Sequence, residues 1–232
     1  MKFHDLAERK DAVELKVPIE SQNIATTSRL SKEEALDFWD NVFAEQHNAS
    51  DRNEIDKVII LEDIYDRCED EFRFDFEIDQ DIWILLDQFK IDHWEQLSEN
   101  ERKMLVCELA VMIGKKLGLE DIPTLSFFDG SENDYGTFNR DGNTIEINSN
   151  NFSQPKELID TIAHEVRHAY QYQRALKLET YEDMLYKYNF DNYISPLKTS
   201  NGEYLFFTDY QDQLVEAEAR AFANLFNKEA SL

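Results

Sequence analysis

The chain has 232 residues, enough for one large domain or two small ones. Hydrophobic residues make up 42% and aromatic residues 12%, which argues against wholesale disorder, and only 6 glycines and 4 prolines argue against a sandwich with many turns. The 49 acidic and 24 basic residues give a net charge of −25, which repels nucleic-acid phosphates and anionic membrane surfaces, so we expect neither partner.

We expect residues 1–94 to be a mainly helical, acidic N-terminal region. Residues 1–30 have no clear hydrophobic period. Ser31 and Glu34 form a capping box, a side-chain pairing that begins a helix, so a helix should begin there. The region should pack as an addition to a second domain over residues 95–232, where a more regular pattern begins.

Residues 62–81 contain ten acidic residues and two arginines. Within them, residues 72–81 alternate apolar with polar or acidic residues, the period of a strand. A calcium site is one alternative, but the stretch lacks the spacing and central glycine of an EF-hand. We therefore expect a solvated acidic face, and a regulatory partner that binds this region is a further alternative.

A second capping box, Ser98 with Glu101, predicts a helix that ends at Gly118. Its predicted buried face consists of Met104, Leu105, Leu109, Met112, Ile113 and Leu117. The following residues 124–148 are predicted to form a small antiparallel sheet, because a hairpin signal, Asp141-Gly142, precedes an alternating strand.

Two further helices are expected in the C-terminal half. The first is capped by Ser153, has Pro155 in its first turn and runs to about Leu178. Its buried stripe is Leu158, Ile162, Val166 and Ala169. Residues 190–208 resemble a loop. The last helix is expected over residues 210–228, with one face made of Leu214, Ala217, Ala221, Phe222 and Leu225.

The cysteine content and the N-terminal sequence indicate the expected cellular compartment. Cys68 and Cys107 are too few for a disulfide framework, so we expect two free thiols, as in a reducing compartment. The N-terminus has no apolar signal core, and no apolar run is long enough to cross a bilayer. We expect a cytoplasmic protein, or one exported without an ordinary signal peptide.

The most informative motif is HExxH at residues 164–168. His164 and His168 are four residues apart on a predicted helix, so both project from one face and can share one ion. Glu165 lies about 100° round the helix, where it can reach a water on that ion and act as general base. The competing interpretation is an exposed amphipathic helix that carries two solvent-facing histidines.

A catalytic zinc site needs a third protein ligand. The metzincin pattern HExxHxxGxxH would need Gly at position 171 and His at position 174. This chain has Gln and Arg there, so that class is excluded. A carboxylate from the last helix is the other common solution, and Glu216 and Glu218 both lie there. They point about 200° apart, so only one can face the ion, and we expect Glu216 because it borders the packed side.

Helical geometry also gives candidates that would orient the ligands. Asp160 lies one turn before His164 and can accept its free imidazole N–H, although Glu218 or a backbone carbonyl is an equal competitor. Arg220 lies one turn after Glu216 and can orient its carboxylate.

The HEVRHAYQ stretch, followed by Glu216, Ala219, Phe222 and Ala223 in the spacing ExxAxxFA, resembles the gluzincin-type zinc metallopeptidases. The likeness is strongest to ImmA/IrrE-like proteins and related phage and polymorphic-toxin peptidase domains, and it covers roughly residues 95–230. In that family the first Glu of ExxAxxFA is the third zinc ligand, which matches Glu216. The sequence departs from the smallest members in a long aromatic insert at residues 179–209.

The resemblance implies an α+β, zincin-like fold, mainly helical, with a small antiparallel sheet before the HExxH helix. It also implies one zinc ion per chain, a protein or peptide substrate, and an exposed edge strand that pairs with the substrate. That strand would be Thr144–Asn148, with Ile145, Ile147 and Asn148 as substrate-binding residues. Gluzincins often place a tyrosine or histidine to stabilise the oxyanion, and among Tyr193, Tyr204 and Tyr210 we expect Tyr210.

The sequence therefore predicts a zinc-dependent endopeptidase that hydrolyses peptide bonds with a metal-activated water. Two alternatives stay open. One is a non-catalytic zinc-binding protein with a regulatory or interaction role, against which Glu165 argues, because a structural zinc site needs no base. The other is a toxin or effector peptidase domain whose N-terminal region serves delivery or neutralisation by a partner.

Overall fold

The computed structural model describes residues 61–131, 135–199 and 204–229. Over these residues the chain is a mixed α+β structure with seven α-helices and a small three-stranded sheet, as expected. The α-helices are α2 (Gln80–Asp87), α3 (Ile91–Trp94), α4 (Glu99–Lys116), α5 (Pro155–Lys177), α6 (Tyr181–Asp191), α7 (Phe207–Gln211) and α8 (Leu214–Glu229). The strands are β1 (Thr124–Phe128), β2 (Gly136–Asn139), β3 (Thr144–Asn148), β4 (Leu197–Lys198) and β5 (Tyr204–Leu205), and short 3-10 turns are η3 (Leu61–Asp63), η4 (Glu69–Glu71) and η5 (Ser149–Asn151). The helix expected from Ser31 lies outside the described residues.

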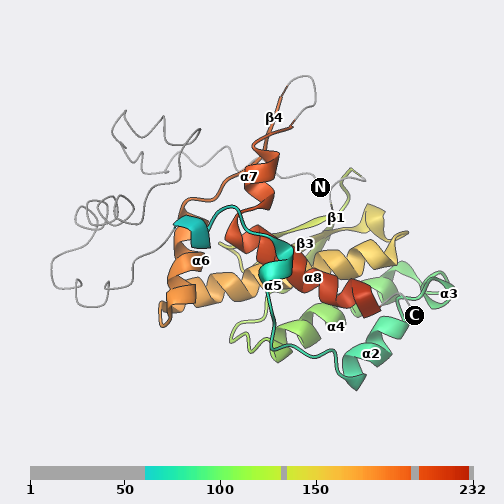
Figure 1. Cartoon of the computed structure of the whole chain (residues 1–232). Coiled ribbons are helices and arrows are strands. Elements are labelled where there is room, and N and C mark those ends of the chain that lie inside the picture. The colour runs from blue at the N-terminus through green and yellow to red at the C-terminus, as the bar shows by residue number, and fades with distance from the viewer. Residues whose placement is uncertain (1–60, 132–134, 200–203, 230–232) are drawn as a thin grey trace. The chain divides into compact units, whose positions relative to one another are not determined.

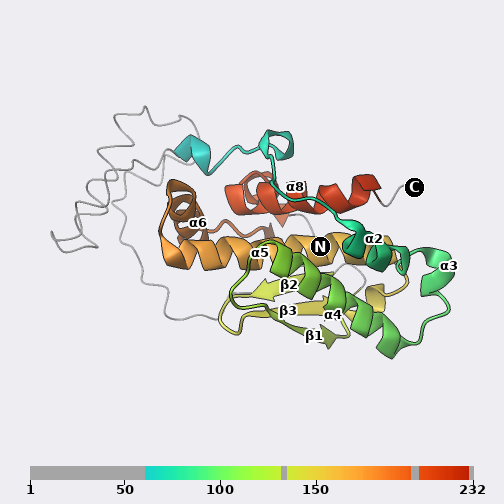
Figure 2. The same cartoon turned by 90° about the horizontal axis from the view of Figure 1, so that it is seen from below.

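Helix α5 is at the centre of the fold. It packs most extensively against α8, and also against α4, α6 and β2. In Figure 1 the red helix α8 crosses the view in front of α5, and Figure 2 shows the two side by side, with the sheet on the other side of α5. The predicted apolar stripe is fully buried: Leu158, Ile162, Val166 and Ala169. Every residue from 161 to 169 is buried, so this helix carries polar side chains into the interior.

The start of α5 differs from the prediction in its cap. Pro155 occupies the first turn as expected, but the residue at the cap position is Gln154, whose side chain makes no capping hydrogen bond. Ser153 is therefore not the cap. Proline has a helical φ and no N–H to satisfy, so the helix can begin here without a side-chain acceptor.

Helix α4 begins at the predicted capping box. The Ser98 hydroxyl accepts a hydrogen bond from the Glu101 N–H, and the Glu101 carboxylate accepts from the Ser98 N–H at 2.7 Å. Gly118, with φ of 77°, follows the helix end as predicted, because glycine adopts this left-handed conformation readily. The predicted buried face is wrong at Met104, which is 63% exposed, and the helix buries Val106 instead.

The sheet is mixed and not antiparallel as predicted. Strands β2 and β3 form the expected hairpin around Asp141-Gly142, but β1 pairs parallel with β3, giving the order β1–β3–β2. The Asn148 side chain holds the connection after β1, since it accepts from the Gly130 N–H and donates to the Ser131 carbonyl. Alternating residues predict strands but not the direction of their neighbours, and a parallel pair needs the longer connection that β2 and its turns provide here.

The acidic stretch at residues 72–79 is extended with alternating burial, but it pairs with no strand among the described residues. Its acidic side chains Asp75, Glu77 and Asp79 are exposed, as expected for a solvated face. Its inward phenylalanines, Phe74 and Phe76, contact Phe222 of α8 edge to face, with ring centroids 5.4 and 4.9 Å apart. The period of two therefore reflects packing of an extended segment on a helix.

Replacing Phe222 with alanine should lower the free energy of unfolding by about 3–5 kcal/mol, because the ring of this α8 residue is fully buried beneath the extended segment. Urea denaturation measures this. Met104→Ala, at an exposed site on α4, is the control and should change stability by at most about 0.5 kcal/mol. Equal losses of stability from both changes would contradict the packing of the extended segment on Phe222.

The described residues from Ile64 onward form one compact unit. The boundary expected between residues 94 and 95 falls inside it, because η4 packs on α8 and α2 packs on α4. Arg220 of α8 illustrates this contact, since its Nε donates to Glu69 of η4 at 2.6 Å. Most of residues 1–63 lie outside the described ranges.

Residues 179–213 contain more regular structure than the sequence predicted. Helix α6 was not expected, although Thr180 and Asp183 form a capping box at its start. The expected loop at residues 190–208 contains the small β4–β5 sheet and the start of α7 (Figure 1). The expected last helix is interrupted at Asp212 and Gln213, which separate α7 from α8.

Both cysteines are free thiols, as predicted, with Cys68 exposed and Cys107 partly buried. In the part of the chain that the structure describes, every helix is too short or too polar to cross a membrane.

Candidate metal centre

Three side chains that can bind a metal meet between α5 and α8. His164 and His168 come from α5, and Glu216 comes from the first turn of α8. The two histidine Nε2 atoms are 3.0 Å apart, and the Glu216 carboxylate oxygens lie 3.5 Å from His164 Nε2 and 3.3 Å from His168 Nε2. All three residues are buried, and one ligand atom of each lies within 4.8 Å of the others. The sequence-predicted ligands are therefore brought together.

This donor set suits a zinc ion. Zinc is commonly held by imidazole nitrogens and carboxylate oxygens at about 2 Å, and two such ligands of a tetrahedral ion lie roughly 3.3 Å apart. The separations found here, 3.0 to 3.5 Å, are close to that value. The two imidazoles and the carboxylate also face one another in the interior, and a single cation could accept electron pairs from all three.

The position of Glu216 depends on how α8 begins. The first N–H groups of a helix have no partner within the helix and need outside acceptors. The Leu214 N–H donates to the Ile64 carbonyl at 2.7 Å, and the Val215 N–H donates to the Asn189 side chain of α6 at 2.9 Å. These contacts fix the first turn of α8 against two other segments, so Glu216 faces the histidines of α5.

Two tyrosines donate hydrogen bonds to Glu216. The Tyr193 hydroxyl donates to Oε1 at 2.5 Å, and the Tyr210 hydroxyl donates to Oε2 at 2.6 Å. Burial, together with the charge of Glu216, raises the pKa of both phenols well above the ordinary value, so both keep their protons. Because the single proton of Tyr210 is directed at Glu216, its expected role as oxyanion donor is not supported by this geometry. Tyr204 is exposed, outside this cluster.

Two expected orienting contacts are absent. Asp160 accepts a hydrogen bond from the Asn227 side chain at 2.7 Å instead of from His164, whose Nδ1 has no partner among the described residues. Arg220 donates to Glu69 and to the Gln211 carbonyl, each within 2.6 Å, and does not orient Glu216. Sequence spacing placed both residues one turn from a ligand, but each side chain points to a neighbouring element.

The residue that orients His168 is Gln171, which the sequence analysis missed. Its side-chain oxygen lies 2.9 Å from His168 Nδ1, so it can accept the imidazole N–H, while its amide donates to Glu218 at 2.9 Å. Glu218 therefore acts on the site through Gln171. Glu218 also accepts hydrogen bonds from Arg167 and Tyr186, and all of these side chains are buried. The signal available in the sequence was the i, i+3 spacing of His168 and Gln171 on one helix face.

Glu165 lies beside the cluster without joining it. It is 5% exposed, and the Phe138 N–H of β2 faces its carboxylate. Burial is the main cause that raises the pKa of Glu165, and the negative charge of Glu216 adds to it, while His164 and His168 oppose the shift. A carboxylate with a raised pKa binds a proton more tightly and is therefore a stronger base than an ordinary glutamate.

The cluster is also a coupled acid–base group. Burial alone would lower the pKa of His168, but the charges of Glu216 and Glu165 and hydrogen bonds to Glu216 and Gln171 raise it to about 9. Burial alone would raise the pKa of Glu216, but the two histidines hold it well below the ordinary value. In metal-free protein, the two groups therefore form an ion pair at neutral pH.

This ion pair predicts a pH dependence of the metal-free protein. A histidine whose folded pKa lies above its ordinary 6.5 contributes stability that is complete below pH 6.5 and is lost as the pH rises to about 9. The free energy of unfolding of chelator-treated protein should therefore fall across this window in urea titrations. The decrease should vanish in His168→Gln and persist in His93→Gln, a change at an exposed histidine of α3. Constant stability from pH 6.5 to 9 would contradict the pairing.

The residues expected to bind substrate are not accessible. Ile145, Ile147 and Asn148 are fully buried, and their strand β3 is the central strand, paired on both sides. The prediction of an exposed edge at β3 is therefore wrong. The edge strand next to the metal centre is β2, which packs on α5 and pairs only with β3 among the described residues.

No protein-family model, curated protein or solved structure matches this chain.

Proposed function

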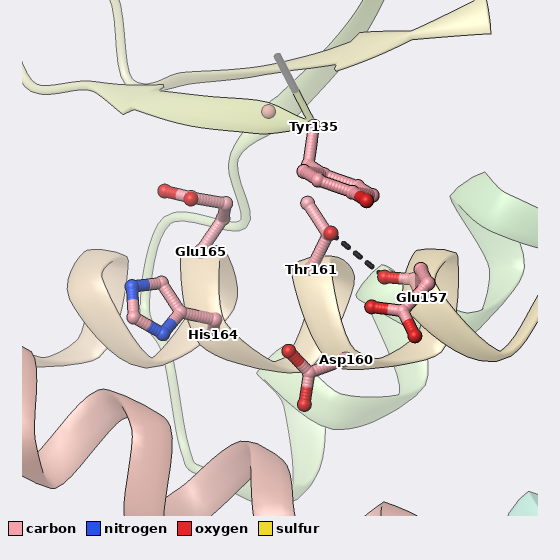
Figure 3. Close-up of a pocket in the computed structure, with 7 residues that line it drawn as sticks. Tyr135, Glu157, Asp160, Thr161, His164 and Glu165 are labelled. Atoms are coloured by element: carbon pink, nitrogen blue, oxygen red, sulfur yellow. Dashed lines mark hydrogen bonds between the residues drawn. The ribbon is translucent and has the colours of Figure 1, made fainter. Parts of the chain in front are cut away.

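We propose that the chain is a zinc-dependent endopeptidase in which His164, His168 and Glu216 hold zinc and Glu165 is the general base. The observation that carries the proposal is a buried set of two imidazoles and one carboxylate beside a second buried carboxylate that lines a pocket. A structural zinc site is normally closed by four protein ligands, whereas a catalytic site has three and an open position. Among the described residues, only three such groups gather here, and His164 and Glu165 both line the pocket (Figure 3).

Zinc held here would act as a Lewis acid, lowering the pKa of a bound water toward neutrality and polarising the substrate carbonyl. Glu165 would accept the proton of that water and deliver it to the leaving amine, with the Phe138 N–H facing its carboxylate. Tyr193 and Tyr210 would hold Glu216 in place, and Gln171 would hold His168. In this proposal the chain supplies a base, a ligand set and groups that orient both.

Strand β2 supplies the surface for the substrate backbone in this proposal. The Phe138 N–H points to Glu165 and not to β3, so this edge of β2 faces the metal centre. An extended peptide can add to such an edge by main-chain hydrogen bonds. Gly136 of the same strand lines the pocket, which connects the edge to the site where cleavage would occur.

The test is cleavage of an unfolded protein, such as reduced and alkylated casein, by the full-length chain, followed by mass spectrometry. We expect cleavage by the zinc-loaded protein, loss of cleavage after chelation and recovery on addition of zinc. Zinc bound without detectable cleavage of any unfolded substrate would overturn the peptidase proposal and favour a non-catalytic zinc-binding role.

A further inference from the structure

A pocket of about 180 Å³ opens beside the metal centre. His164 and Glu165 line one end of it, and Gly136 of β2 and the preceding residue, Tyr135, line another side. Figure 3 shows Tyr135 above Thr161, on the side of α5 that faces the sheet. A side chain at position 136 would not fit, because its Cβ would lie 2.9 Å from the Thr161 methyl and 2.8 Å from the Glu146 carbonyl oxygen. Glycine therefore lets β2 approach α5 closely enough to form the pocket wall.

Two carboxylates line the part of the pocket that lies away from the metal centre. These are Asp160 and Glu157, on the two turns of α5 that precede His164 (Figure 3). One Asp160 oxygen accepts from the Asn227 amide, and neither acid forms an ion pair with a described residue. Lys156 lies next to Glu157 and one turn before Asp160, but it forms no ion pair with either acid. The pocket therefore carries negative charge without a cationic partner from the described chain.

These acids do not form a second metal site. Among the described residues, the one group with metal-binding geometry is His164, His168 and Glu216. The volume of about 180 Å³ is also below the range of roughly 300–1,000 Å³ typical of pockets for small-molecule ligands. The size suits one side chain, and the charge favours a cation.

The distances along α5 suit a long side chain. At about 1.5 Å per residue, Asp160 lies roughly 6 Å and Glu157 roughly 10 Å along the helix from His164. Lysine and arginine carry their charge at the end of a stem of three or four methylene groups. Their apolar stems would lie against the Tyr135 ring and the Thr161 methyl group while the charged head reaches the carboxylates.

We propose that this pocket selects substrates with a lysine or arginine side chain next to the bond that is cleaved. The inference rests on the proposed peptidase function. The pocket adjoins both the candidate base Glu165 and the candidate ligand His164, so a side chain bound there belongs to a residue beside the scissile bond. Glu157 and Asp160 are the residues that determine the preference, by attraction of the opposite charge.

The test uses zinc-loaded full-length protein and peptides built on a cleavage site mapped in casein. The three peptides differ at a single position next to the cleaved bond, which is lysine in one, methionine in the second and glutamate in the third. We expect kcat/KM for the lysine peptide to exceed that for the methionine peptide by about tenfold and that for the glutamate peptide by about a hundredfold.

Variants then test the two acids. Glu157→Gln and Asp160→Asn together should remove most of the lysine preference, and Glu157→Lys should raise cleavage of the glutamate peptide by about tenfold over wild type. Because Glu157 is exposed, its variants should fold even if the change at Asp160, which contacts Asn227, does not. Glu108→Gln, an exposed change of the same charge on α4, is the control and should keep the wild-type ratios.

The outcomes separate the two proposals. Cleavage that shows no preference for a basic residue, or a preference that survives in Glu157→Lys, overturns the specificity inference and leaves the peptidase proposal standing. Absence of cleavage of every peptide and of casein overturns both proposals. A preference that moves with Glu157 while the control is unchanged supports both.

Discussion

Glu165→Gln should lower kcat for peptide cleavage by about 10²- to 10⁴-fold while the protein still binds zinc. The substitution keeps the size of the side chain and removes its ability to take a proton. Because Glu165 is buried and its burial disfavours the charged form, the glutamine variant should be at least as stable as wild type. Loss of activity can then not be attributed to unfolding.

The measurement combines initial rates, zinc content and thermal unfolding on the same preparations. Glu108→Gln, exposed on α4, is the matched control and should retain activity, zinc and stability. A Glu165→Gln variant that cleaves at the wild-type rate would remove Glu165 from the mechanism, even if zinc were present.

Glu218→Gln should lower the free energy of unfolding by about 3–5 kcal/mol, because it leaves the charge of Arg167 buried without a counter-charge. Arg167 is 6% exposed and Glu218 is 3% exposed. The Arg167 Nε already has no hydrogen-bond partner, so the guanidinium depends on Glu218 for its charge compensation. Aromatic rings of Phe74, Tyr170 and Phe222 around the guanidinium, 4.3 to 5.4 Å from their centroids, give only partial compensation.

Glu69→Gln is the control, since it breaks the more exposed ion pair between Arg220 and Glu69, with 23% and 40% of the side chains exposed. That change should cost at most about 1 kcal/mol. The double variant Arg167→Met with Glu218→Leu should recover most of the stability lost in Glu218→Gln, because no unpaired charge stays buried. Equal small losses from Glu218→Gln and Glu69→Gln in urea denaturation would contradict the buried network.

Zinc affinity distinguishes the roles of the two glutamates of α8, Glu216 and Glu218. Glu216→Gln should weaken zinc binding strongly, since an amide oxygen is a poor replacement for a carboxylate ligand. Glu218→Gln should weaken it by at most about 10- to 100-fold, because Glu218 acts through Gln171.

The sequence predicted the positions of the candidate metal ligands better than their surroundings. Spacing alone places His164 and His168 on one face, and Glu216 is expected over Glu218 because it borders the packed side of the last helix. The structure brings Glu216 to the histidines and directs Glu218 to Arg167. The direction of each of these side chains could be predicted because it depends on geometry within one helix, whereas metal binding itself stays a prediction.

Predictions that depended on contacts between elements failed more often. Asp160 and Arg220 were placed by their spacing from a ligand, but their partners, Asn227 and Glu69, come from other segments. The direction of β1 and the central position of β3 depend on the connection held by Asn148, which alternation cannot reveal. Sequence periodicity reports which face of an element is buried, and only the packed structure shows what covers it.

The helices α6 and α7 show a second limit. Their segment is rich in aromatic and polar residues without a clean helical stripe, yet Thr180 and Asp183 cap α6, and Tyr210 of α7 is buried against Glu216. By the resemblance to small zinc peptidases, most of this stretch is an insert. It supplies both tyrosines that hold the candidate zinc ligand.

The most direct test of the central claim is the zinc content of the protein, measured by elemental analysis after purification without chelators. The proposed site predicts close to one zinc ion per chain in wild type and little in His164→Ala or His168→Ala, because two ligands hold a zinc ion far less tightly than three. His93→Ala, at an exposed histidine of α3, should retain zinc. Wild-type protein that is folded and contains no zinc, and takes up none when zinc is added, would contradict the account.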